Sequence, residues 1–447
     1  MWTALAVVVI AFIVMQYFAR EGLGQEQISD AADTPTPMLR FLGRYAIGTN
    51  EMFSKMGQAT TGQNPADEML VQIDEYAVSR LQQLRAIPVV AELKGKDEAL
   101  ERLSVFVGGN AESELNDDAA VLRTIYTEGV ESVSDENAQR LVDRHEWFGE
   151  LALTYDLGST DAKRVSAVAP GLRTIAFAIV MVICALGFLI GGVALFIMAI
   201  VMLSRRRIRS GYMVAEHPST GARTAYLETV VIGLFLLVGL QVVASIIQSA
   251  GGPDLGHAML WLVLPAPLWP LLRGVKWPEL KLALGLHCGR GFWRECGCGV
   301  LGYFAGLPVL FAGVVLMFVF KLISELTAPD EGAHPIVTTL PSSPGIWFIL
   351  FLFSMLCIWA PVVEELLFRG AFYHHVRRRW GAVLSALFVG FIFAAIHPQG
   401  FLTIPPLTAL AFNIAMVREW RGSIIAPMAL HAFNNGIAFT AMCFLFF

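Results

Sequence analysis

Charged residues and cysteines are both scarce in this chain. Only 15% of its 447 residues are charged and 55% are hydrophobic, against about 25% and about 45–50% in an average soluble protein. This composition excludes an ordinary soluble domain and predicts a multi-pass membrane protein. None of the six cysteines lies in residues 21–170, so a disulfide framework is excluded there.

The charges that are present gather in one region. Residues 21–170 hold 26 of the 37 acidic and 13 of the 32 basic residues, a net charge of −13, whereas the rest of the chain carries +8. We infer that an acidic, water-facing region separates a first apolar segment from a membrane core. So acidic a region is a poor match for phosphate backbones, and we expect no nucleic-acid partner.

The apolar segments predict an all-α fold, a polytopic membrane helical bundle of about eight or nine transmembrane helices with an N-terminal extracytoplasmic helical domain. We divide the chain into an N-terminal membrane anchor (1–20), the acidic domain (21–170), transmembrane segments (171–275) and a C-terminal intramembrane core (276–447). Segments of spanning length, about 20 residues, lie near residues 2–18, 174–203, 225–248, 257–272, 297–324, 345–376, 381–397, 401–417 and 423–446.

Basic residues predict the orientation of these segments. The first segment has no basic residue before its apolar run and no clear cleavage site, which favours an uncleaved anchor. Clusters of Lys and Arg at 205–209, 273–281, 377–379 and 418–421 follow alternate segments. Because such loops stay in the cytoplasm, we expect a cell-membrane protein whose N-terminus is cytoplasmic and whose residues 21–170 are extracytoplasmic.

The acidic domain shows helical periodicity but no chemistry. Stretches such as ADEMLVQIDEYAVSRLQQLRAI and SDENAQRLVDRHEWFGELALTY place apolar residues three and four apart, and Ser134 is a predicted N-cap. A Pro/Thr linker, DTPTPM, precedes them. We expect a small helical domain, without a metal cluster, nucleophile motif or phosphate loop.

The stretch PVVEELLFRG, residues 361–370, puts three ionisable side chains inside an apolar segment: Glu364, Glu365 and Arg369. A charge at bilayer depth normally faces a protein interior or a water-filled cavity, because lipid exposure costs a few kcal/mol. Glu365 and Arg369 are four apart and can pair on one helix face. Glu364 points about 100° away and is left free for other partners.

Polar residues on later apolar segments reach a similar depth. Phe393 and His397 end the segment 381–397, and His431 and Asn435 lie four apart in the last segment. Counted from the basic loops, Glu364 and His397 lie about 20 Å deep, with Asn435 and His431 at about 18 Å and about 12 Å. We therefore expect one pocket. Its candidate catalytic residues are Glu364, Glu365, His397, His431 and Asn435, with Arg369 and Phe393 as structural support.

Two chemistries fit this set. Glu364, its pKa raised by burial, can take a proton from water beside His397 while His431 and Asn435 donate hydrogen bonds to an oxyanion. Alternatively, Glu364, His397 and His431 ligate Zn²⁺ and leave one position for water. The residues alone leave the cofactor unknown, with zinc as the candidate, and no HExxH or GxSxG motif is present.

Two functions without peptide hydrolysis use the same pocket. A non-catalytic binding or immunity protein could hold a peptide or lipid there, and a proton-coupled transporter also needs carboxylates at mid-membrane. Against transport, we find no convincing inverted repeat and only one cluster of intramembrane charges.

Three motifs, EExxxR in EELLFR, FxxxH in FAAIH and HxxxN in HAFNN, follow one another on successive apolar segments. In this order they resemble the CPBP intramembrane proteases, which include CAAX prenyl endopeptidases and bacteriocin-processing and immunity proteins. The resemblance covers about residues 280–446, including the Gly-rich stretch that begins LALGLHCG.

The resemblance implies an all-helical core around a conical cavity and endoproteolysis of a membrane-embedded or membrane-anchored protein at the lipid bilayer. It also implies that Glu364 activates water with help from His397, that His431 and Asn435 stabilise the oxyanion, and that Glu365 and Arg369 hold the first helix. Both metal-dependent and metal-free mechanisms are argued for the family. Nothing in the chain indicates prenylated substrates.

Overall fold

The structure is a computed structural model that describes residues 1–13, 37–55, 65–77, 79–107, 113–214, 224–252, 256–325, 345–397 and 399–446. Every regular element in these ranges is a helix, which confirms the prediction of an all-α polytopic membrane bundle. The chain divides into two compact units. The membrane unit comprises Met1–Arg20, Ala185–His334 and Gly345–Ala441, and the acidic unit comprises Glu21–Cys184, Pro335–Pro344 and Met442–Phe447.

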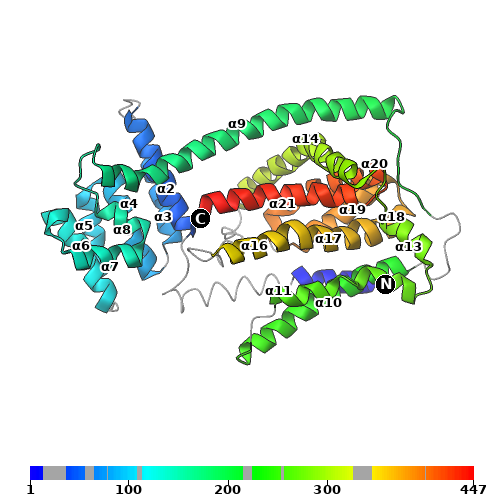
Figure 1. Ribbon diagram of the computed structural model, residues 1–447, viewed down its shortest axis with the longest axis horizontal. Helices are drawn as coiled ribbons and strands as arrows, with labels where there is room; N and C mark the ends of the chain where they lie inside the picture. Colours follow the sequence, from blue (N-terminus) through cyan, green and yellow to red (C-terminus); the bar gives the residue numbers. More distant parts are fainter. Residues whose placement is uncertain are drawn as a thin grey trace. The chain divides into compact units, whose positions relative to one another are not determined.

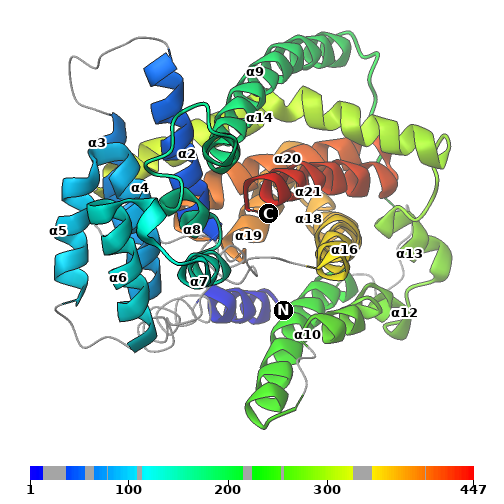
Figure 2. The same cartoon turned by 60° about the vertical axis from the view of Figure 1, so that its left-hand side comes forward.

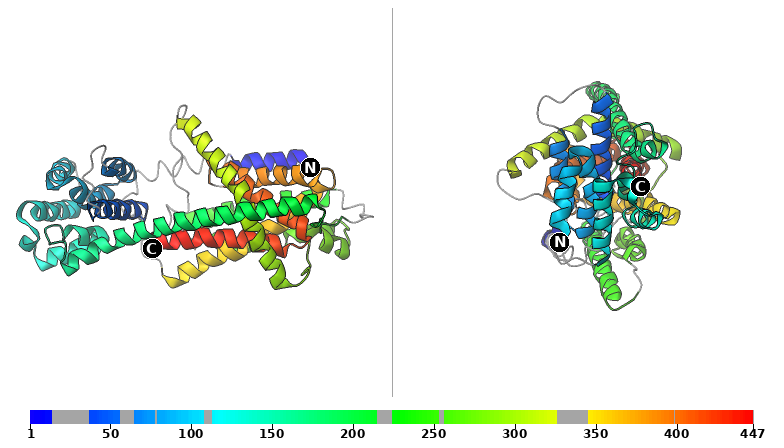
Figure 3. Two further views of the ribbon diagram at one scale, coloured as in Figure 1. Left: turned by 90° about the horizontal axis from the view of Figure 1, so that it is seen from above. Right: turned by 90° about the vertical axis from the view of Figure 1, so that its left-hand side faces the viewer.

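Short helices build the acidic unit (Figure 3). The N-cap predicted at Ser134 is present, since its side chain accepts a hydrogen bond from the Asn137 amide. Ser79 and Gln82 form a reciprocal capping box at the start of α4. The helices are α2 (Pro37–Lys55), α3 (Pro65–Tyr76), α4 (Arg80–Lys94), α5 (Lys96–Val107), α6 (Ser113–Glu128), η1 (Val130–Ser132), α7 (Asp135–His145), α8 (Trp147–Ala152) and the first turns of α9 (Ala162–Ser204).

Asp118 is the most deeply buried carboxylate of the acidic unit's α6. Its oxygens accept from Arg144 Nη1 at 2.6 Å and Arg140 Nε at 3.1 Å, and lie 3.1 Å from His145 Nε2. Burial alone would raise the pKa of this carboxyl, but the hydrogen bonds from His145 and Arg144 outweigh it and hold the pKa below its usual range. Burial lowers the pKa of the His145 imidazole, against the opposing effect of Asp118.

The membrane unit combines long apolar helices with several short ones (Figure 1). An N-terminal helix, Trp2–Ile13, precedes them and contributes Leu5 and Val9 to the main apolar core. The others are α9, α10 (Ala225–Ser249), α11 (Gly256–Met259), η3 (Leu260–Val263), η4 (Ala266–Leu268), α12 (Trp269–Leu272), α13 (Trp277–Leu284), α14 (Phe292–Glu325), α16 (Ile346–Ser354), η5 (Met355–Trp359), α17 (Ala360–Glu365), η6 (Leu366–Phe372), α18 (Tyr373–Arg377), α19 (Ala382–Ala395), η7 (Phe401–Thr403), α20 (Ile404–Arg421) and α21 (Ile425–Phe446).

Within the described ranges, five helices are long and apolar enough to cross a membrane, namely Ala162–Ser204, Ala225–Ser249, Phe292–Ile323, Ile346–Arg377 and Phe401–Arg421. The apolar helices Leu260–Leu272 and Ala382–Ala395 are shorter. The segment predicted near 257–272 is divided among α11, η3, η4 and α12. Pro265, Pro267 and Pro270 explain the division, because each proline removes a backbone donor.

Helix α14 packs closely on the C-terminal helices. A side chain at Gly299 would collide with the Ala426 carbonyl of α21, and one at Gly306 would collide with Asn413 of α20, whose amide donates to the Gly306 carbonyl at 2.8 Å. Small residues at such contacts let membrane helices approach backbone to backbone. Figures 1 and 2 both show α21 alongside α16, where the rings of Phe353 and Phe439 lie 5.5 Å apart.

Candidate active site

The helix that carries the EExxxR motif contains two π-helical turns. They are η5, which ends at Trp359, two residues before Pro361, and η6, which begins directly after Glu365. In the π register the Leu356 carbonyl would accept from residue 361, which is a proline without an N–H. Asn435 Nδ2 of α21 supplies the missing donor at 2.8 Å. The Leu356 carbonyl, which Pro361 leaves without a backbone donor, therefore receives its hydrogen bond from a side chain of the last helix.

Glu365 and Arg369 form a fully buried ion pair. Arg369 Nη1 donates to Glu365 Oε1 at 2.9 Å, and both side chains are 0% exposed. Arg369 Nη2 also donates to the Ala411 carbonyl of α20 at 3.2 Å, and its guanidinium lies 4.7 Å from the centre of the Phe393 ring. The pair therefore ties the motif helix to both α19 and α20.

His431 contacts the same carboxylate. Its Nδ1 lies 2.8 Å from Glu365 Oε1. An ionised carboxylate only accepts hydrogen bonds, so Nδ1 is assigned the proton and Nε2 keeps its lone pair. Glu365 thus orients the His431 ring, a contact that the helix periodicity did not predict.

His397 lies in the turn just after α19, which ends at Ala395, and not within a helix that runs to residue 397. Its Nδ1 is 2.6 Å from the Phe393 carbonyl oxygen. Because a carbonyl oxygen accepts only, this ring too carries its proton on Nδ1 and leaves Nε2 bare. The Phe393 ring supports the imidazole at 4.1 Å between centroids.

Glu364 faces both imidazoles. Its Oε2 lies 3.8 Å from His397 Nε2 and 3.9 Å from His431 Nε2. These separations are too long for direct hydrogen bonds. Glu364 Oε2 is buried and has no hydrogen-bond partner among the described residues. Three acceptor atoms therefore converge with no donor between them, an arrangement that calls for a water or a cation.

The spacing of these acceptors does not match zinc. Two ligands on a tetrahedral Zn²⁺, each about 2.0–2.1 Å from the metal, lie about 3.3 Å apart, which is shorter than both separations from Glu364 Oε2. Among the described residues, no group of three His, Cys, Asp or Glu side chains has the geometry to hold a metal ion. The residues predicted as metal ligands come together, but too widely spaced for that role.

The remaining predicted residue, Asn435, lies beside this cluster on α21. Its Nδ2 is committed to the Leu356 carbonyl, and its Oδ1 accepts from Asn434 Nδ2 at 3.2 Å. The sequence motifs assigned no role to either partner, the Leu356 carbonyl or the Asn434 amide. The proline in PVVEE was the one sequence signal for the Leu356 contact, since it removes that carbonyl's partner.

The part of the chain that contains this cluster is similar to a known protein family. Residues 346–437, about a fifth of the chain, match a family model described as type II CAAX prenyl endopeptidase Rce1-like. This segment is similar to that family. The suspected relationship to CPBP proteases is confirmed, and the Rce1-like segment contains every predicted site residue from Glu364 to Asn435.

Two curated relatives have no assigned function. An uncharacterized 24.3 kDa protein of Escherichia coli is 30% identical over 132 residues, which is 28% of this chain and 59% of that protein. The uncharacterized protein YpbD of Bacillus subtilis strain 168 is 30% identical over 118 residues, 26% of this chain and 54% of that protein. The chain thus spans little more than half the length of these relatives. No solved structure matches it.

Proposed function

We propose that this protein is an intramembrane endopeptidase that hydrolyses a peptide bond of a membrane-embedded or membrane-anchored protein. The observation that carries the proposal is the position of Glu364 Oε2, which has no hydrogen-bond partner among the described residues and faces the Nε2 atoms of His397 and His431. Each of these two rings is held by a hydrogen bond at its other nitrogen, Nδ1. The similarity of residues 346–437 to an endopeptidase family supports the proposal.

Water activation falls to Glu364 in this proposal. A water within hydrogen-bond reach of Glu364 Oε2 and His397 Nε2 gives its proton to the carboxylate as its oxygen adds to the scissile carbonyl carbon. Collapse of the tetrahedral intermediate breaks the C–N bond, and the same proton passes to the departing amine. No metal enters these steps.

Oxyanion stabilisation falls to His431. Since Nδ1–H is directed at Glu365, Nε2 can donate to an oxyanion only when it carries a second proton. Asn435 has one amide hydrogen left after Leu356 and is a second donor.

We also propose that residues 21–170 face the extracytoplasmic side, on the strength of the basic clusters at alternate loops. A reporter inserted in the α5–α6 loop should be active outside the cytoplasm. A cytoplasmic signal would reverse the proposed orientation, while leaving the chemistry of the site untouched.

Cleavage of membrane-anchored peptides tests the peptidase proposal. The purified protein in lipid nanodiscs is given a library of such peptides, and Glu364→Gln and His397→Gln should each lower the rate about 10²-fold or more. Glu228→Gln, an equal change at a carboxylate of α10 outside the cluster, should not. Full activity in both site variants would refute the assignment, and no cleavage by the wild type would favour the non-catalytic binding alternative.

A further inference from the structure

A pocket of about 460 Å³ opens on the acidic unit between α4 and α5, beside the end of α3. Its α5 wall uses positions 98, 101, 102, 105 and 106, which form one helix face, and its α4 wall uses 80, 83, 86 and 87. The pocket is of ligand-binding size. It contains none of the residues of the proposed active site.

The floor and the rim of this pocket differ in chemistry. Ala77, Ala86, Ile87 and Phe106 are all at most 7% exposed and form an apolar floor. The rim side chains are exposed and mostly polar. They include Asp74, Gln83 and Glu101, and the apolar Val105, which is 76% exposed.

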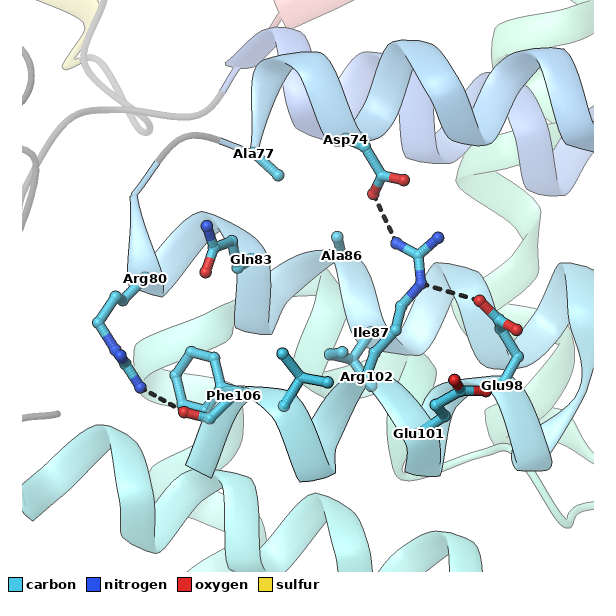
Figure 4. Close-up of a pocket in the computed structure, with 11 residues that line it drawn as sticks. Asp74, Ala77, Arg80, Gln83, Ala86, Ile87, Glu98, Glu101, Arg102 and Phe106 are labelled. Carbon is cyan, nitrogen blue, oxygen red and sulfur yellow. Dashed lines mark hydrogen bonds and ion pairs between the residues drawn. The ribbon is translucent and has the colours of Figure 1, made fainter. Parts of the chain in front are cut away.

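Opposite charges stand at the two ends of the pocket (Figure 4). At one end Arg80 lies 4.3 Å from the centre of the Phe106 ring and donates to the Phe106 carbonyl, and within the described chain it has no carboxylate partner. At the other end Arg102 is held between Asp74 at 2.6 Å and Glu98 at 3.2 Å. Glu101 beside them has no ion-pair partner among the described residues. One cation and one anion thus remain uncompensated, at opposite ends.

The length of the pocket restricts what can use both charges. Glu101 and Phe106, whose carbonyl accepts from Arg80, are five positions apart on α5, about 7.5 Å along the axis, which is the span of about two extended residues. A free amino acid with an uncharged side chain carries both of its charges on one carbon and cannot span this distance. The Gln83 amide between the ends can donate to and accept from a peptide group.

We propose that this pocket binds an extended peptide segment that carries a carboxylate and, about two residues away, a basic side chain. Arg80 meets the carboxylate, Glu101 meets the basic side chain, and the apolar floor takes the small side chain between them. The segment belongs to the water-exposed part of the proteins that the membrane unit cleaves, a link that rests on the proposed peptidase function.

Fluorescence anisotropy with defined peptides tests the pocket without cleavage. The probes are labelled Arg-Ala-Asp, its reverse sequence, and a version with Gln at both charged positions. The protein is the full chain carrying Glu364→Ala, in nanodiscs. At least one charged probe should bind and the Gln probe should bind about tenfold more weakly or not at all.

Glu101→Lys identifies the site. It should weaken binding of the Arg-containing probe about tenfold, and replacing that Arg by Glu should restore binding to the variant. Glu128→Lys, the same charge change at an exposed position of α6 away from the pocket, is the matched control and should have no effect.

Three results would overturn the proposal: no binding of either charged probe, equal binding by Glu101→Lys, or a self-association of the chain that Glu101→Lys abolishes, which would assign the pocket to a second copy. Binding by a chain that cleaves nothing would instead refute the peptidase function and leave the pocket assigned. For an active chain, Glu101→Lys should slow cleavage only of substrates with charged flanking segments.

Discussion

The two units of this protein treat charge in opposite ways. In the acidic unit, most charged side chains lie at the surface around apolar clusters that include Ile73, Val89 and Ile125. In the membrane unit, large apolar side chains such as Ile190 and Phe318 point outward, while Glu365, Arg369 and His431 lie inside. The solvent explains the difference, since water rewards exposed charge and lipid does not.

The buried carboxylates of the two units differ in how far their partners are exposed to water. Asp118 of the acidic unit has three cationic or imidazole partners, two of them on side chains that also reach water. Glu365 of the membrane unit has Arg369 and His431, and both are buried. Because both partners of Glu365 are themselves buried, the membrane unit should respond more strongly to single substitutions.

The largest effect is expected at the Glu365–Arg369 pair. Glu365→Gln or Arg369→Met alone leaves an uncompensated buried charge and should destabilise the membrane unit by about 3–5 kcal/mol. The double variant removes both charges and should be less damaging than either single change. Thermal unfolding in detergent gives the order, and a double variant as unstable as the sum of the singles would show that the two side chains do not act as a pair.

A smaller effect is expected at Asn435. Asn435→Ala removes the donor to the Leu356 carbonyl and should cost about 1–3 kcal/mol, whereas Asn434→Ala on the adjacent position keeps that bond and is the control. Thermal unfolding reports the stability. If Asn435→Ala lowers cleavage with unchanged stability, the residue serves the oxyanion and not the helix.

The smallest effect is the pH dependence of the acidic unit. His145 has a lowered pKa in the folded state, so the unfolded chain binds more protons below about pH 6.5 and stability should fall there, by at most about 1.4 kcal/mol per pH unit. The lowered pKa of Asp118 adds a loss of the same sign at lower pH. Glu92, whose pKa burial raises, works in the opposite direction.

Hydrogen exchange of α6 and α7 amides between pH 5.5 and 7 measures this dependence in the full chain. His145→Gln should flatten the slope, after correction for intrinsic exchange, and His287→Gln in the membrane unit should leave it unchanged. An equal slope in wild type and His145→Gln would remove His145 as the cause.

The sequence predicts contacts best where both residues lie on the same helix. Composition predicted the membrane class, and the spacing of four residues predicted that Glu365 and Arg369 meet, because an α-helix has a fixed pitch. Depth counting also brought Glu364 near His397, which lies 3.8 Å away. Because the rise per residue of an α-helix is constant, depths counted along two neighbouring helices can be compared.

The sequence predicts less well which side chains of two different helices meet, because this depends on how each helix is rotated about its own axis. The contact of His431 with Glu365 depends on the azimuth of α21 around its own axis, which the periodicity of one chain segment does not specify. The π-helical turns and the position of His397 beyond the end of α19 were missed for a related reason. They arise from proline, packing and backbone hydrogen bonds rather than from hydrophobic spacing.

The most direct test of the central claim, that Glu364 activates water without a metal, is the cleavage rate of a membrane-anchored peptide after exhaustive chelation. We predict that the wild type keeps its rate in chelator, and that Glu364→Gln is about 10²-fold slower or worse with and without it. Loss of wild-type activity in chelator and its recovery with Zn²⁺ alone would contradict the account. So would full activity of Glu364→Gln.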